Sequence, residues 1–269
     1  MLGAGWLGYP LSVRLRKLGY QVKTATTSAE KAQRFNDKGF EAYQIEVTPD
    51  GINGRIDDFL QADILVLTLP PGGRRNPAVR AEYPSKIQQV IEAAQQAAVQ
   101  QVLFTSSTGV YGDQNAWVNE QSPLQPTTPS GEALVKVEDQ LRTAFGDQLT
   151  ILRLAGLVGG ARHPGRWFAG KEGVSGGEQY INLVSRIDVS SICAAIIESG
   201  YWGHTLNVCA DGHPTKAEFY PAASAALDLD PPTFITDPTA DRGKRVDNQK
   251  SKEVPGFNYE YPDPMRFIL

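Results

Sequence analysis

Few cysteines, short apolar runs and no excess of basic residues exclude several classes of protein. Only Cys193 and Cys209 are present among 269 residues, and both lie in apolar surroundings of the sequence. We therefore expect buried thiols rather than a disulfide or a metal site. The strand-like run Ile64–Leu67 is far too short to span a bilayer. The formal net charge of −4 argues against a nucleic-acid surface, which needs concentrated Lys and Arg.

Targeting signals are also missing. The first residues have no basic region followed by an apolar core, as a secretory signal would have. We expect a cytoplasmic protein with no membrane and no nucleic-acid partner. His204 and His213 are isolated from other residues at metal-ligand spacing, so we predict no metal site.

Strand-length apolar runs alternate with helical patterns over the first part of the chain. This alternation is typical of βαβ units and a parallel sheet. Leu7, Leu11, Leu15 and Leu18 recur at helical spacing before Gly19. The predicted strands are 20–26, 40–47, 62–69, 101–105 and 149–154, and the following helices 29–38, 77–99 and 129–145. A sheet at least six strands wide is expected.

The alternation of strand and helix patterns ends after Gly156. Seven glycines occur between Gly159 and Gly177 without sustained periodicity, which indicates a loop region. Short elements return later, among them a helix with Asp188 and Ser190 as candidate caps. We place a domain boundary at residue 159, between a domain of residues 1–159 and a smaller lobe of residues 160–269.

Gly3-Ala4-Gly5-Trp6-Leu7-Gly8 matches the pattern Gly-x-Gly-x-x-Gly and opens the first helix. The first glycine permits a tight turn, the second a close approach of the backbone to a pyrophosphate, and the third close packing of helix on strand. An ordinary glycine-rich turn is the alternative, but the alternation downstream favours a dinucleotide site. Only Met1 and Leu2 precede this loop, so we expect that several residues of a first strand are lost from the N-terminus.

The end of the strand that follows the first helix, here predicted at 20–26, normally discriminates between NAD and NADP. An acidic residue there binds the ribose 2′-hydroxyl of NAD, whereas hydroxyl and basic groups accommodate the 2′-phosphate of NADP. The chain has Thr27 and Ser28 at this place, followed by Lys31 and Arg34. The sequence therefore favours NADP over NAD, although either hydroxyl also suits a helix cap.

Several segments resemble those of one known family. They are Gly3–Gly8, Phe104–Gly112, Glu120–Pro123 and Leu152–Gly159. With their order along the chain, they are similar to the extended short-chain dehydrogenases/reductases, the nucleotide-sugar epimerase and dehydratase group. The resemblance implies an α/β fold, a Rossmann-type doubly wound parallel sheet binding NAD or NADP, with a smaller C-terminal α/β lobe for substrate. It also implies a small-molecule ligand, anionic or a sugar nucleotide, and a homodimer as in many relatives.

The catalytic set of that family is incomplete here. Ser107 falls on its serine position, but none of the ten tyrosines has a lysine four positions later. The tyrosine position falls on Ser130 and the lysine position on Leu134, so the usual proton donor is missing. Ser107 and Tyr111 are the remaining catalytic candidates, although the aromatic mostly shapes the pocket in the family. The strand ends Leu69, Pro70 and Ser106 complete the predicted cofactor site.

Other polar residues suggest a substrate site. His163 lies in a glycine-rich loop and is a candidate general acid, or else a surface histidine. Arg162, Arg166 and Arg245 suit an anionic ligand such as a diphosphate, or serve solubility. Residues 72–75, Gly-Gly-Arg-Arg, follow the predicted strand 62–69 and suit a phosphate.

Two functional hypotheses follow. As an enzyme, the protein would transfer hydride between NADPH and a carbonyl polarised by Ser107, with water or His163 as proton donor. As a non-catalytic module, it would bind the dinucleotide and report redox state to a partner. The residues at positions 130 and 134 favour the second hypothesis, whereas Ser107 favours the first.

Overall fold

The chain forms two compact units in the computed structural model, which describes residues 1–72, 76–235, 237 and 239–268. Unit 1 comprises Met1–Gly112, Leu124–Arg153 and Cys193–Thr205. Unit 2 comprises Asp113–Pro123, Leu154–Ile192 and Leu206–Leu269. Three segments, 113–123, 154–159 and 193–205, distinguish this division from a single break at residue 159. That break stays a prediction about the functional lobes.

Unit 1 is built on a largely parallel sheet. The strands that form it or lead out of it are β1 (Lys23–Thr26), β2 (Glu41–Thr48), β3 (Gly51–Gly54), β4 (Ile64–Leu67), β5 (Gln101–Ser107), β7 (Leu149–Leu154) and β10 (Thr205–Val208). Their order is β1-β2-β3 in one part and β10-β7-β5-β4 in the other. Leu2 joins the two parts because it bridges Ala25 of β1 and Leu67 of β4 in parallel. Leu2 alone therefore lies between β1 and β4 as a bridge residue. The expected loss of several residues of a first strand stays a prediction.

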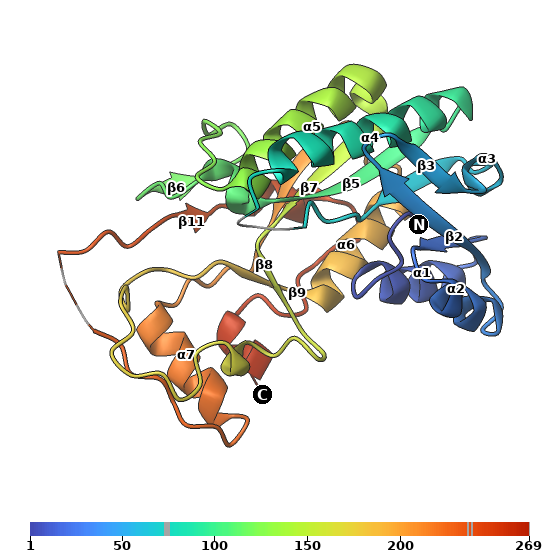
Figure 1. The fold of residues 1–269 in the computed structure, drawn as a ribbon. Helices are drawn as coiled ribbons and strands as arrows, with labels where there is room; N and C mark the ends of the chain where they lie inside the picture. Colours follow the sequence, from blue (N-terminus) through green and yellow to red (C-terminus); the bar gives the residue numbers. More distant parts are fainter. Residues whose placement is uncertain (73–75, 236, 238, 269) are drawn as a thin grey trace. The chain divides into compact units, whose positions relative to one another are not determined.

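Helices cover both faces of this sheet. They are α1 (Gly8–Lys17), α2 (Ala29–Asn36), α3 (Ile56–Phe59), α4 (Val79–Gln96), α5 (Pro129–Phe145) and the end of α6 (Arg186–Ser199). Figure 1 shows α4 and α5 together on one face, with α1 on the other. The predicted doubly wound α/β fold is confirmed.

Local chemistry explains where these elements begin and end. Thr128 caps α5 by accepting the Gly131 N–H at 3.1 Å, as expected for a hydroxyl before Pro129. Helix α4 ends earlier than predicted because Ala98 adopts a left-handed φ of 54°. β1 begins at Lys23 rather than at Tyr20, and the antiparallel strand β3 was not predicted.

Unit 2 has short elements and its own small core. They are β6 (Trp117–Val118), β8 (Gly156–Val158), β9 (Leu183–Ser185), the start of α6, α7 (Lys216–Ala225), β11 (Arg245–Val246) and the 3₁₀ turns Pro164–Arg166, Gln249–Glu253 and Pro264–Ile268. Strand β11 pairs with β6, and β9 with β8, both in parallel. Val158, Leu183 and Phe219 are among the buried residues of its core. A capping box of Thr215 and Glu218 starts α7.

The predicted caps of α6 are wrong. The helix begins at Arg186, and Ser185 supplies the capping hydroxyl, which accepts the Ile187 N–H at 3.1 Å. Asp188 lies inside the first turn, fully buried, and its carboxylate accepts the backbone N–H groups of Glu260 and Tyr261 at 2.7 and 3.3 Å. The prediction of Asp188 as a cap was wrong because a carboxylate near a helix start can accept N–H groups from a distant segment as well as from the helix itself.

Cys193 and Cys209 are free and buried. Burial raises the pKa of the Cys193 thiol to about 12, so this sulfur stays protonated and unreactive. None of the described helices combines the length and apolarity needed to cross a membrane.

Candidate functional site

The glycine loop before α1 is shaped by close packing. Gly3 has a φ of 102°, and a Cβ there would lie 2.9 Å from the Thr68 hydroxyl oxygen. A Cβ on Gly8 would lie 2.4 Å from the Gly3 carbonyl oxygen. Neither position has room for a side chain, so the protein itself requires the first and third glycines.

Gly5 differs from these two glycines. A Cβ there would meet nothing closer than the Gly3 carbonyl oxygen at 3.9 Å, and the backbone has an ordinary negative φ. The folded chain does not require glycine at this position, whereas a ligand approaching the backbone does. The loop leads into the N-terminus of α1, whose first turn has no acidic side chain. Such an end suits the anionic pyrophosphate of a dinucleotide, and the predicted residues Trp6 and Leu7 belong to the same turn.

The end of β1 lies beside this loop, since Ala4 donates its backbone N–H to Ala25 at 2.8 Å. Thr27 is exposed, and the Ser28 hydroxyl accepts the Lys31 N–H at 3.3 Å, which caps α2. The first carboxylate after the strand, Glu30, lies in the first turn of α2. The strand end itself therefore presents hydroxyl groups.

The end of β4 lies on the other side of the loop. The Leu69 carbonyl accepts the Tyr83 hydroxyl at 2.8 Å, which fixes the backbone there, and Pro70 follows it at the surface. Gly72 has open space around it. The predicted phosphate contacts at Gly73, Arg74 and Arg75 lie outside the described residues.

The end of β5 directs two neighbouring serines to different places. The Ser107 hydroxyl accepts the Gly109 N–H at 3.0 Å and caps the 3₁₀ turn η1 (Thr108–Tyr111), while its side chain stays partly exposed. The Ser106 hydroxyl points into the core and donates to Glu138 at 2.6 Å. Side chains alternate along a strand, so only Ser107 presents its hydroxyl outside the core.

Beneath these serines lies a buried charged cluster that the sequence interpretation missed. Glu138 of α5 is fully buried and accepts Arg153 Nη2 at 2.7 Å and Arg142 Nη2 at 2.8 Å. Arg153 of β7 is 2 % exposed. Its guanidinium and the Ser106 hydroxyl satisfy a carboxylate that is costly to bury alone. Two charges within apolar periodic segments were the available signal, since Glu138 follows Val137 and Arg153 interrupts an otherwise buried strand.

Tyr111 belongs to the same cluster. Its ring is fully buried, and its hydroxyl accepts Arg153 Nη1 at 2.9 Å. The guanidinium also lies 5.1 Å from the ring centroid, within cation–π range. Its predicted catalytic role stays a prediction, but the phenol oxygen is directed to Arg153 within the core.

Ser130 and Leu134 lie on one side of α5, four residues apart. Ser130 Oγ is 3.4 Å from the capping hydroxyl of Thr128, and Leu134 is 5 % exposed. Neither supplies a phenol or an ammonium group at these positions. The local geometry is therefore that of a capped helix start with an apolar side chain one turn later.

His163 lies in unit 2, where its Nδ1 accepts the Gly165 N–H at 3.1 Å and caps a 3₁₀ turn. Burial lowers its pKa, and the neighbouring charge of Arg166 lowers it further, so the neutral ring is favoured. Arg162 and Arg166 are exposed. The described residues include no group of three His, Cys, Asp or Glu side chains able to hold a metal ion.

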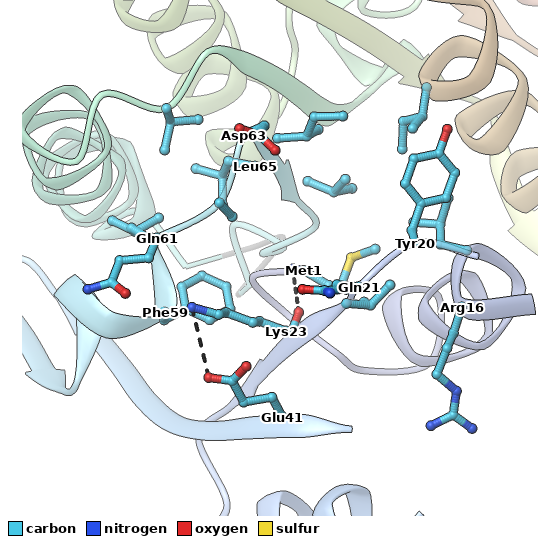
Figure 2. A pocket seen from close by; sticks show the side chains of 18 of the residues that line it. Met1, Arg16, Tyr20, Gln21, Lys23, Glu41, Phe59, Gln61, Asp63 and Leu65 are labelled. Atoms are coloured by element: carbon cyan, nitrogen blue, oxygen red, sulfur yellow. Dashed lines mark hydrogen bonds and ion pairs between the residues drawn. The ribbon is translucent and has the colours of Figure 1, made fainter. Parts of the chain in front are cut away.

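A cavity of about 530 Å³ lies in unit 1 at the amino ends of β1 and β4 (Figure 2). Apolar and polar side chains line it together, among them Met1, Tyr20, Lys23, Phe59, Asp63 and Leu65. The Lys23 ammonium lies 3.8 Å from the Glu41 carboxylate at this end of β1. Ligands of parallel α/β sheets bind at the carboxyl ends of the strands, so this cavity is not the expected dinucleotide site.

Comparisons with known proteins agree with this geometry. Residues 3–200 match a family model described as NAD(P)H-binding. Protein YeeZ of Escherichia coli K12 is 37 % identical over 267 residues, which cover 98 % of this chain and 96 % of YeeZ. The structure of MoeE5 in complex with UDP-glucose and NAD has a TM-score of 0.79 and 19 % identity, covering 99 % of this chain and 94 % of that one. UDP-glucose 4-epimerase from Thermotoga maritima has a TM-score of 0.77 and 17 % identity, covering 99 % and 96 %.

Proposed function

Because this chain belongs to the NAD(P)H-binding family, we propose that unit 1 binds NADP(H) at the glycine loop and serves reductase or epimerase chemistry without a Tyr-x-x-x-Lys pair. The solved neighbours include epimerases, so the predicted resemblance to the epimerase and dehydratase group is confirmed at the level of the fold. The substrate class we propose is a small anionic or sugar-nucleotide molecule, by analogy with the ligands named for these neighbours.

One observation carries the cofactor proposal. Gly5 is the one glycine of the three in the loop whose missing side chain leaves open space, next to the start of α1. The fold does not require Gly5 to lack a side chain, and the absence of a side chain there allows a pyrophosphate to approach the backbone closely. Gly3, Gly8, Trp6 and Leu7 form the rest of this proposed contact.

The preference for NADP(H) is supported by the end of β1. Thr27 and Ser28 offer hydroxyl groups, and the exposed cations Lys31 and Arg34 on α2 suit a 2′-phosphate. We expect NADPH to bind at least tenfold more tightly than NADH. Isothermal titration of the intact protein with both nucleotides measures this ratio, and equal affinities would remove the preference.

In the reductase proposal, Ser107 orients the substrate. Its oxygen already accepts the Gly109 N–H, and no acceptor for its proton is found among the described residues, so this O–H is free to donate to a carbonyl oxygen. When bound, the nicotinamide supplies the hydride. The carbonyl carbon would take up the hydride and the oxygen a proton from solvent or from His163, since Ser130 and Leu134 provide neither the phenol nor the ammonium group of the usual pair. Tyr111, Leu69, Pro70 and the Ser106 backbone form the proposed wall of the site.

A second candidate function is a dinucleotide-binding module without catalysis. Ser130 and Leu134 favour it, because the two positions that normally provide the acid and its cation carry neither group. In this case Ser107 and Tyr111 shape the nicotinamide pocket only.

Turnover separates the two candidates. The test mixes wild-type protein and Ser107→Ala with NADPH and a panel of carbonyl compounds, including keto sugars, and follows the absorbance of NADPH. The reductase proposal expects oxidation that falls at least tenfold in Ser107→Ala while NADPH affinity is retained, and no loss in Ser130→Ala. Tight NADPH binding without turnover by any variant would leave the non-catalytic module.

A further inference from the structure

The sheet of unit 1 has a gap between β1 and β4. Among the described residues, Met1 and Leu2 are the ones that pair with both strands. The Leu2 N–H donates to the Val66 carbonyl at 2.9 Å, and the Ala25 N–H donates to the Met1 carbonyl at 3.0 Å. Neighbouring strands lie about 4.8 Å apart, so β1 and β4 lie roughly 10 Å apart here. This is the distance between two strands that have a third strand between them.

The cavity of about 530 Å³ continues this gap toward the amino ends of the two strands. The parallel bridges of Leu2 fix a register, in which the four places before Met1 lie opposite residues 20–23 on the β1 side and 62–65 on the β4 side. All eight of these wall residues line the cavity. Figure 2 shows the two walls on opposite sides of the cavity. We call this cavity the strand slot.

Main-chain groups of both walls face the strand slot. Successive residues of a strand direct their N–H and C=O groups to opposite neighbours. The Lys23 carbonyl accepts the Met1 amino group at 2.8 Å, so the Lys23 N–H faces the slot as well. Val66 accepts the Leu2 N–H, so Val66 and Ile64 face the slot from β4. Among the described residues, none accepts the N–H groups of these three wall residues. An extended segment supplies carbonyl groups at the spacing they require.

The Met1 amino group lies where the strand slot meets the sheet. It is buried, and burial lowers its pKa to about 5, so the group is uncharged at neutral pH. Its bond to the Lys23 carbonyl is the one that a peptide N–H makes in a parallel strand. An amide nitrogen at this position keeps the bond and removes an ionisable group from the core.

The surroundings of the strand slot favour an apolar occupant. Helices cover both faces of the sheet in unit 1, and Leu2 and Val66 are buried. A strand buried on both faces consists of consecutive apolar residues, and β-branched ones are preferred. The Lys23 ammonium donates to the Asp58 carbonyl at 2.5 Å and lies 3.8 Å from the Glu41 carboxylate. The charge on this wall therefore has partners already.

We propose that the strand slot accepts an extended apolar segment of four residues, joined to Met1, as a further parallel strand between β1 and β4. Main-chain hydrogen bonds to both walls hold such a segment, and its apolar side chains select it. Leu2 is followed at once by Gly3, so the added strand anchors the glycine loop. The gain in cofactor affinity that follows from this anchoring rests on the proposed function, whereas the pairing of the segment does not.

The test compares the full chain with two variants that carry four added residues joined to Met1, either Val-Ile-Val-Ile or Gly-Ser-Gly-Ser. The Val-Ile variant should raise the thermal midpoint by at least about 5 °C. Amide exchange at Lys23, Ile64 and Val66, measured by NMR, should slow at least tenfold. The Gly-Ser variant is the matched control, because it has the same length without apolar side chains. Its midpoint should stay within about 2 °C of the unextended chain, with these three amides unchanged.

The proposal is overturned if the two variants give equal midpoints, if the three amides exchange equally fast in both, or if the Val-Ile variant alone aggregates in size-exclusion chromatography, because an inserted strand is not exposed. A free acetyl-Val-Ile-Val-Ile amide at millimolar concentration should leave the unextended chain unchanged. Slowing of the same amides by this peptide would mean that the slot docks a separate chain, which contradicts the proposal.

NADPH titration of the same samples tests the proposed function separately. The affinity of the Val-Ile variant should rise at least threefold over that of the Gly-Ser variant. Slowed amides with no NADPH binding by either variant would support the added strand and contradict the cofactor site at the glycine loop.

Discussion

Glu138 and Arg153 bring opposite charges into the core of unit 1, where neither meets bulk water. A pair of this kind gains little net stability over an apolar core, but it is expensive to break, because the remaining charge stays buried. The cluster joins α5 and β7 to Ser106 at the end of β5 and to Tyr111. These two residues flank Ser107 in sequence, so the cluster fixes the backbone that presents the proposed substrate-orienting hydroxyl.

Replacing Glu138 with Gln should therefore destabilise the protein strongly. Arg153 and Arg142 lose their shared carboxylate, and we expect a cost of about 3–5 kcal/mol in the free energy of unfolding. Denaturant titration measures it. Asp139→Asn is the matched control, since this neighbouring acid pairs with Arg142 at the surface and should cost less than about 1 kcal/mol. Equal costs for the two variants would mean that the buried cluster has no special weight.

The three glycines of the loop should respond differently to alanine. Gly8→Ala forces a Cβ against the Gly3 carbonyl oxygen at 2.4 Å, so both stability and cofactor affinity should fall. Gly5→Ala has space in the folded chain, so the thermal midpoint should stay within about 2 °C of wild type, as for a neutral surface change. Its NADPH affinity should nevertheless fall at least tenfold. Retained affinity in Gly5→Ala would contradict the proposed pyrophosphate contact.

Elements distant in the chain are tied together by single polar side chains. Asp188 in the first turn of α6 accepts two backbone N–H groups of the C-terminal segment, at Glu260 and Tyr261. The Tyr259 hydroxyl accepts the Cys209 N–H at 3.3 Å, beside β10. These contacts satisfy backbone N–H groups of the two segments, which a stretch without regular secondary structure cannot do by itself.

Docking of the C-terminal segment should depend on pH through Asp188. Burial raises the pKa of this carboxyl to about 6, and the charge of Glu260 adds to the rise, while the two N–H groups oppose it. An unfolded Asp ionises near pH 4, so the contribution of Asp188 to stability is present below that pH and is lost as the pH rises through about 6. The wild-type thermal midpoint relative to Asp188→Asn should fall between pH 4 and 7.

Asp263→Asn provides the control for this experiment, because it removes an exposed acid from the same segment. Its midpoint should run parallel to that of the wild type across the range. A constant difference between wild type and Asp188→Asn would show that Asp188 does not titrate in this window.

At the scale of the whole molecule, the proposed cofactor site and the strand slot belong to the same unit. The glycine loop, the ends of β1, β4 and β5, and both walls of the strand slot lie in unit 1. The slot lies at the amino ends of β1 and β4, whereas the glycine loop lies at their carboxyl ends.

Hydrogen exchange should locate the cofactor in unit 1. NADPH at a hundredfold excess over its Kd should stabilise the protein by about 2.7 kcal/mol and slow exchange in the glycine loop and the strand ends of unit 1. Peptides covering β6 and β11 in unit 2 should change less. NADPH protection confined to the unit 2 peptides would contradict the assignment of the cofactor to the glycine loop.

The sequence by itself determined the parts of this protein that depend on neighbours along the chain. Apolar runs and helical spacing were sufficient for the parallel sheet and for α5, whose predicted bounds agree with the structure because Thr128 and Pro129 fix its start. The glycine pattern and the lack of a Tyr-x-x-x-Lys pair were equally local. The short strand β3 and the first turn of α6 were missed or misplaced because tertiary contacts override weak local signals there.

Only the tertiary structure decided which charged side chains meet. Tyr111 and Arg153 are 42 residues apart, yet the arrangement of β5 and β7 in one sheet brings them into contact in the core. Arg245 reaches Trp117 and Tyr180 through the pairing of β11 with β6. Periodicity reports which face of an element is buried, whereas the partner of a buried or stacked charge depends on sheet order and register, which no local pattern contains.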